Sequence, residues 1–219
     1  QGEKMKLFNY CLITLTALLS PAVFSSEINS GDTAWILTAT ALVLFMTLPG
    51  LALFYGGMTR SKNVLNMFMM NMYCVGIVPI VWVLLGYSIG NSPDGSGFFG
   101  GEWIGNFDFI GLEGLSGDPE SLIFVAFLMT FAAITPALIS GAVADRLKFS
   151  AWVVFVPIWL LLVYCPATYW VYNGWHDGNG ALDFAGGTAI HLNSGVAALA
   201  FVLVLGLSLI HISEPTRLL

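Results

Sequence analysis

Residues 181–192 read ALDFAGGTAIHL, so an acid, two glycines and a histidine open a stretch that is otherwise apolar. The apolar residues continue to about residue 209, which is long enough for a transmembrane helix. A titratable side chain such as His191 is costly within lipid and by default indicates a functional site. The stretch therefore predicts a spanning helix with His191 about two turns below its outer end.

The composition is that of a membrane protein. Of the 219 residues, 57% are hydrophobic and 9% are charged, and the mean hydropathy is +0.83. Soluble domains carry about 25% charged residues, so a water-soluble surface is excluded. The net charge of −6 argues against a nucleic-acid partner, which requires a basic patch. The three cysteines lack metal-ligand spacing and no nucleotide-binding glycine motif occurs, so neither a metal nor a cofactor is expected.

The two ends of the chain differ from its centre. Residues 1–4 precede Met5 and resemble stray leader sequence. Residues 5–25 combine a short basic start, an apolar run and small residues before a cleavage point, which predicts a secretory signal peptide. An uncleaved extra span is the alternative. Residues 208–219 do not continue the preceding helix naturally and are expected to be a non-native tail, which leaves 26–209 as the principal region.

Five apolar runs in this region reach the roughly 20 residues that a spanning helix needs. Backbone groups in lipid must be satisfied within the segment, so these spans must be helical. The predicted fold class is an all-α polytopic membrane protein. The five expected spans cover roughly 33–56, 64–90, 121–143, 150–172 and 186–209.

The basic residues predict the orientation. Arg60 and Lys62 lie between the first two spans, and Arg146 and Lys148 lie between the third and fourth. The alternate loops carry acidic residues without lysine or arginine. The positive-inside rule places the two basic loops in the cytoplasm and the mature N-terminus outside. A multi-pass protein of the inner or plasma membrane is expected.

Two polar residues at the fifth span are candidates for chemistry. A neutral imidazole both donates and accepts a hydrogen bond, so His191 could line a path for a small polar molecule. Its alternative role is a hydrogen bond to a neighbouring helix. Asp183 precedes the same span and is expected to accept from the free N–H groups of its first turn, or to add negative potential at an external opening.

Aromatic residues gather near the outer ends of the third and fourth spans. Phe127 and Phe131 are four residues apart and therefore share one helix face. Core or lipid-facing packing is the simplest interpretation, and an aromatic opening that attracts a cation is the alternative. Trp170, Tyr172 and Trp175 could supply a second wall of such an opening.

Three sequence blocks carry a resemblance to a known family. They are LVLFMTLPGLALFYGGMTRSKNVL (42–65), ISGAVADRLKFSA (139–151) and GALDFAGGTAIHLNSGVAAL (180–199). Together they resemble the ammonium transporter family (Amt/Mep/Rh), and its Amt branch in particular. The resemblance covers roughly 30–207 and implies the first five-helix half of an inverted-repeat, eleven-span fold that assembles as homotrimers.

The resemblance also implies roles for individual residues. An external aromatic site would recruit ammonium, with Phe127 beside it and Asp183 supporting it from behind. The recruiting aromatic falls on Tyr172 with a one-residue gap, and Trp170 and Trp175 lie close enough to leave that alignment open. Phe131 would be one ring of the pore gate.

His191 would be the first of two pore histidines that transfer protons while ammonia passes. The second histidine, the second gate phenylalanine and a recruiting serine would belong to the other half. The resemblance implies transport rather than enzymatic activity. It also implies a cytosolic regulator of the PII type as a partner, beside the lipid bilayer.

Two alternatives share this scaffold: an ammonium sensor, and a gas channel of the Rh type that conducts NH3 or CO2. The block DFAGG favours the Amt branch over the Rh type. A membrane enzyme that uses His191 and Asp183 as acid and base lacks an accompanying nucleophile motif.

Overall fold

The computed structural model describes residues 29–93, 97–99, 101 and 103–206. The predicted signal peptide and the predicted non-native tail lie outside these residues. Almost all of the regular structure in the described part is helical, with one isolated β-bridge between Phe98 and Ile104. The all-α fold class is therefore confirmed.

Within the described residues, five helical segments are long and apolar enough to cross a membrane, as the hydropathy pattern predicts. The described α-helices run within them, joined by 3-10 and π turns that carry the label η. The five segments are Ser30–Met58, Ser61–Asn91, Pro119–Val143, Phe149–Gly178 and Gly187–Leu205.

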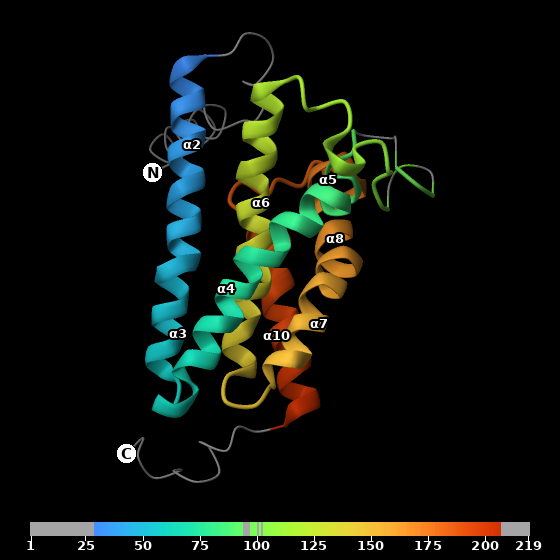
Figure 1. Cartoon of the computed structure of the whole chain (residues 1–219). Helices are drawn as coiled ribbons and strands as arrows, with labels where there is room; N and C mark the ends of the chain where they lie inside the picture. The colour runs from blue at the N-terminus through green and yellow to red at the C-terminus, as the bar shows by residue number, and fades with distance from the viewer. Residues whose placement is uncertain (1–28, 94–96, 100, 102, 207–219) are drawn as a thin grey trace, which may run out of the picture.

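Each segment is built from consecutive helical pieces (Figure 1). The first contains α2 (Ser30–Phe45), η2 (Met46–Leu51) and α3 (Ala52–Met58), and the second contains η3 (Ser61–Asn63), α4 (Val64–Val81), η4 (Trp82–Gly86) and α5 (Tyr87–Asn91). The third contains α6 (Pro119–Ser140) and η6 (Gly141–Val143), and the fourth contains α7 (Phe149–Trp159), η7 (Leu160–Tyr164), α8 (Cys165–Tyr172) and α9 (Trp175–Gly178). The fifth contains η8 (Gly187–Leu192) and α10 (Asn193–Leu205).

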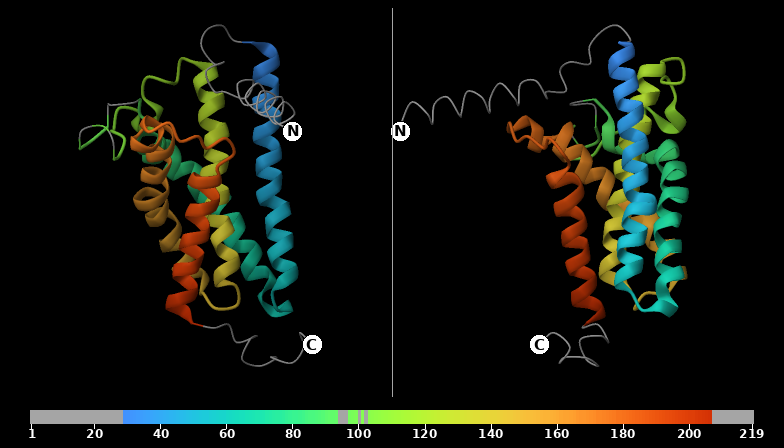
Figure 2. Two further views of the ribbon diagram at one scale, coloured as in Figure 1. Left: turned by 180° about the vertical axis from the view of Figure 1, so that it is seen from behind. Right: turned by 90° about the vertical axis from the view of Figure 1, so that its left-hand side faces the viewer.

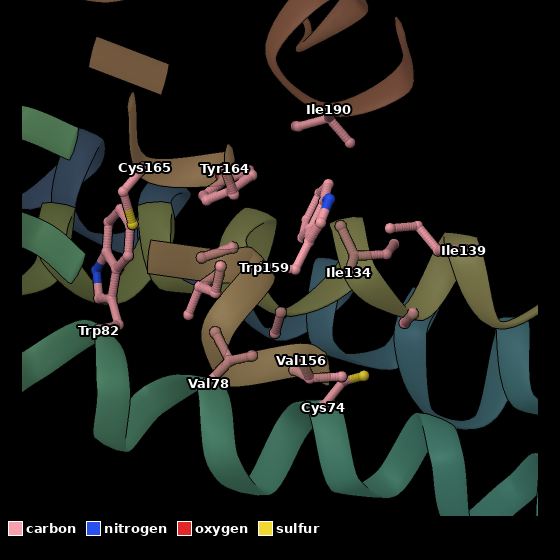
Figure 3. Close-up of a cluster of buried hydrophobic side chains, with 14 of the residues drawn as sticks. Cys74, Val78, Trp82, Ile134, Ile139, Val156, Trp159, Tyr164, Cys165 and Ile190 are labelled. Atoms are coloured by element: carbon pink, nitrogen blue, oxygen red, sulfur yellow. The ribbon is translucent and has the colours of Figure 1, made fainter. Parts of the chain in front are cut away.

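The helix α6 is the centre of the bundle. Half of the most apolar part of its segment is buried, compared with 17% for the first and fifth segments. The neighbours α2, α4 and α10 all pack against it. Small side chains at Ala132, Ala133 and Ala137 are fully buried on α6 and let these helices approach closely. Figure 3 shows the adjoining core, where Trp82, Trp159 and other apolar side chains meet.

The first and fifth segments have large exposed apolar faces. Leu192, Val196, Leu199 and Leu203 are all more than half exposed on η8 and α10. Because water is absent from the hydrocarbon core, such faces suit contact with lipid or with further helices. Figure 2 shows α10 at the side of the bundle, with the start of α2 and the end of α10 at opposite ends.

The loop between the second and third segments folds back onto α5. The Ser88 hydroxyl donates to the Asn106 carbonyl at 3.0 Å and accepts from the Phe109 N–H at 3.0 Å. The Ser92 hydroxyl donates to Asn106 Oδ1 at 2.7 Å. These buried bonds fix the loop as an irregular cap at one end of the bundle (Figure 1).

Candidate functional site

The start of the fifth segment is organised by Asp183. Its Oδ1 accepts from the Gly187 N–H at 2.7 Å, and its Oδ2 accepts from the N–H groups of Thr188 and Ala189, both at 2.9 Å. The first N–H groups of a helix lack intrahelical partners, so this carboxylate satisfies three of them. Gly186 makes the arrangement possible because its φ of 71° lies in the left-handed region that favours glycine. The predicted capping role of Asp183 is thus confirmed.

Tyr172, the last residue of α8, is the aromatic residue that meets this carboxylate. Its side chain is half-buried and lies close enough to the Asp183 carboxylate for the two groups to interact. The end of α8 and the start of the fifth segment therefore come together at Asp183.

Trp170 lies in a different environment. Its indole N–H donates to the Trp103 carbonyl, and the rings of Trp103, Trp170 and Trp175 lie 6.3–6.4 Å apart, centroid to centroid. Residues two apart on an α-helix point about 200° apart, so Trp170 and Tyr172 face different directions. The structure joins Trp170 and Trp175 to Trp103 in the loop that caps this end of the bundle, and places Tyr172 beside Asp183.

The two phenylalanines of α6 contact each other directly. The Phe127 and Phe131 ring centroids lie 4.8 Å apart at an interplanar angle of 89°, an edge-to-face pair. Both side chains are half-buried. Their helix packs against η8, and α8 packs against η8 as well. The helical elements α6, α8 and η8 are therefore neighbours, and they carry the two phenylalanines, Tyr172 and His191, respectively.

His191 is placed on the free face of the fifth segment. Its side chain is exposed, whereas the preceding Ile190 is 5% exposed and points into the core in Figure 3. The His191 N–H donates to the Gly186 carbonyl at 3.0 Å, an i→i−5 bond of the π turn. His191 shares its free face with exposed apolar side chains, including Leu192 and Val196.

Comparison with known proteins identifies this arrangement. The sequence model of the Ammonium Transporter Family matches residues 34–214. The chain belongs to this family.

Two relatives illustrate the similarity. An ammonium transporter of Aquifex aeolicus is 43% identical over 200 residues, which cover 88% of this chain and 46% of the relative. An ammonium transporter of Mycobacterium bovis is 46% identical over 205 residues, which cover 81% of this chain and 43% of the relative. The chain thus spans less than half the length of these ammonium transporters.

A solved structure agrees with the sequence comparison. The crystal structure of Saccharomyces cerevisiae Mep2 superposes with a TM-score of 0.73 at 32% sequence identity. The match covers 83% of this chain and 41% of that one. The fold is therefore the first five-helix half of the ammonium transporter fold.

The sequence analysis assigned no site role to the loop between the third and fourth segments. In this loop, Asp145 and Arg146 make side-chain hydrogen bonds to the loop between the first two segments and to the end of α10, respectively. In the sequence analysis, Arg146 served only as a signal of topology. An Asp-Arg pair directly after an apolar span was the available hint, because charges at a helix end can bind its free carbonyl groups.

Metal binding has no donor set in the described part of the chain. Within residues 29–93, 97–99, 101 and 103–206, no three His, Cys, Asp or Glu side chains gather in a way that could hold a metal ion. Cys74 and Cys165 are buried and free. In the described region the candidate chemistry therefore rests on aromatic rings, one carboxylate and one imidazole.

Proposed function

We propose that this chain forms the outer recruitment site and one wall of the pore of an ammonium transporter. The observation that carries the proposal is the fixed start of the fifth segment: Asp183 holds the first turn, and His191 lies one to two turns further along on the free face. In the full-length protein, a second five-helix half would cover that face and complete the pore.

The recruitment site would use Tyr172 and Phe127. Ring faces attract an ammonium ion by about 0.5–2 kcal/mol once water is displaced. The contact between Tyr172 and Asp183 favours Tyr172 over Trp170 as the recruiting aromatic. The phenol oxygen of Tyr172 carries lone pairs, which could accept from an ammonium N–H.

Asp183 would act on the cation through space. Its two oxygens already accept three backbone N–H groups and interact with the Tyr172 phenol. Little acceptor capacity remains for direct contact with ammonium. The carboxylate would instead orient Tyr172 and add negative potential at the outer opening.

Phe131 would form one ring of the gate beneath this site, and an apolar passage would follow. An intact cation pays a desolvation penalty of several kcal/mol in such a passage. Neutral NH3 avoids that penalty. We therefore propose that ammonium loses its proton near the gate and that His191, with a histidine from the other half, transfers the proton separately.

The assembly and the orientation are parts of the same proposal. A homotrimer, the inner or plasma membrane, an outside N-terminus and a cytosolic PII-type regulator follow from the family resemblance. The basic loops around Arg60 and Arg146 lie at the same end of the bundle, which supports a shared cytoplasmic side (Figure 1). The names of the two relatives favour transport over a sensor or an Rh-type gas channel.

The test is the ammonium-driven current of the full-length protein in planar bilayers or liposomes. His191→Ala should abolish the current or remove its selectivity over potassium, because the proton path is lost. His176→Ala is the matched control, since His176 lies in α9 beside Trp175 and has no place in the proposed pore. An unchanged current with unchanged selectivity in His191→Ala would overturn the proposed role.

A further inference from the structure

The guanidinium of Arg146 joins the inner ends of two helical segments. Its Nη1 donates to the Gly206 carbonyl at 2.5 Å, directly after the last residue of α10. Its Nη2 donates to the carbonyl of Ala142, in the η6 turn that ends the third segment. One side chain thus contacts the C-terminal ends of the third and fifth segments.

The carbonyls of Ala142 and Gly206 both lie at helix ends, where carbonyl groups lack donors. The last carbonyls of a helix have no intrahelical partner, and they form the negative end of the helix dipole. A cation at this position satisfies the carbonyls and interacts favourably with the dipole. The forked donors of arginine can reach two carbonyls at once, which a lysine ammonium on a single stem does less well.

The guanidinium is also partly enclosed. Its Nε atom is buried and has no hydrogen-bond partner among the described residues. A charge held in this way depends strongly on the bonds of its remaining nitrogens, because water cannot readily replace them. The η6 turn packs against α10, so the contact reinforces an existing interface.

The neighbouring residue ties the same loop to the other inner loop. Asp145 has a φ of 62°, and its carboxylate accepts from Asn63 Nδ2 at 2.5 Å and from the Arg60 N–H at 3.5 Å. Two consecutive residues thus bind different partners, Asp145 the preceding inner loop and Arg146 the end of α10. The loop is therefore held by contacts on both sides, which restrain the backbone from which the Arg146 side chain extends.

We propose that Arg146 is a positioning residue that holds the inner end of α10 against η6. The helix α10 continues from the turn that carries His191, and η6 continues from the helix that carries Phe131. Holding the two ends together would keep the histidine and the gate phenylalanine in register across the pore. This role in transport rests on the proposed function, whereas the fastening of α10 does not.

The test compares Arg146→Gln, Arg146→Lys and the control Lys148→Gln in the full-length protein. Lys148 lies in the same loop and is exposed, so its replacement removes the same charge and the same topology signal. The first measurement is hydrogen exchange at the amides of the last turn of α10 in lipid nanodiscs. The second is the concentration dependence of ammonium uptake at equal amounts of membrane protein.

Arg146→Gln should raise exchange in the last turn of α10 by about tenfold, because a charge-assisted bond is lost. Arg146→Lys should restore part of the protection, and Lys148→Gln should leave it unchanged. Maximal uptake should fall about tenfold in Arg146→Gln with little change in the half-saturating concentration, since the recruitment site lies at the opposite end of the bundle.

Unchanged exchange in Arg146→Gln, or an equal rise in Lys148→Gln, would overturn the fastening role. Increased exchange with unchanged maximal uptake would overturn the link to transport while leaving the fastening intact. Loss of function in His191→Ala is measured independently, so a failure of the proposed function is distinguishable from a failure of this inference.

Discussion

Replacing Asp183 with alanine should release the first turn of the fifth segment. The carboxylate accepts from Gly187, Thr188 and Ala189 at 2.7–2.9 Å. Hydrogen bonds to a charged group contribute about 1.5–3 kcal/mol each, and loss of a single helix cap typically costs about 0.5–2 kcal/mol. Because the side chain is half-buried and water would re-solvate some donors, we expect a local cost of about 3 kcal/mol.

The asparagine variant should lie between alanine and the parent. One amide oxygen can still accept from Thr188 and Ala189 if it takes the place of Oδ2, while the bond from Gly187 is lost. The expected cost is about 1.4 kcal/mol, a factor of ten in the local opening equilibrium, against roughly 150-fold for alanine. The order of the local opening equilibria, largest for alanine and smallest for the parent, therefore tests how many backbone N–H groups each side chain holds.

The assay is amide hydrogen exchange of the peptide that contains residues 187–189, in the full-length protein in nanodiscs. Asp177→Asn is the matched control, because Asp177 is an exposed acid in the short helix α9 that precedes the same junction. The reasoning is refuted if Asp183→Ala exchanges no faster than Asp177→Asn, or if alanine and asparagine give equal rates.

Two further predictions concern the two ends of α6. Gly141→Ala should lower unfolding stability by about 1–3 kcal/mol, since its Cβ would lie 2.6 Å from the Tyr55 ring, whose hydroxyl donates to the Leu138 carbonyl. Gly76→Ala should be neutral or stabilising, because a Cβ at this position would meet no atom within 4 Å. Equal melting temperatures of the two variants in detergent would contradict this contrast. Asp118 accepts from the Ser121 hydroxyl at 2.5 Å, and this bond holds the pKa of the carboxyl below its ordinary 3.8. The ionised carboxylate should stabilise the first turn of α6 above pH 3.8, and this stabilisation should be lost as the pH falls through the lowered pKa. Amide protection of that turn, corrected for intrinsic exchange, should therefore drop over this pH range in the parent but not in Asp118→Asn.

Much of the fold was predictable from sequence because membrane insertion depends on the summed hydrophobicity of neighbouring residues. Twenty apolar residues in a row predict a span whatever lies beside it. The end of the fourth segment was less predictable: the expected range closes at residue 172, whereas α9 extends the segment to Gly178. That short helix carries polar residues, and it packs against α8, a tertiary contact that hydropathy does not report.

The candidate site was predictable in its residue types but not in its pairings. The spacing between Phe127 and Phe131 predicted a shared face, and the rings do meet. The sequence left Tyr172, Trp170 and Trp175 as competing aromatics near Asp183. The structure places Tyr172 at the carboxylate and Trp170 at the Trp103 carbonyl, because the two side chains leave α8 in different directions.

The sequence alone determined that five segments between residues 29 and 206 are helices apolar enough to span a membrane, and it located the capped start of the fifth span with its histidine. Those features depend on local composition and on residues close together in the chain. The tertiary structure decided which groups meet across helices: the Tyr172 phenol at Asp183, and the Arg146 guanidinium at the end of α10. Such contacts join residues 11 and 60 positions apart, and packing of the bundle, rather than any local preference, brings them together.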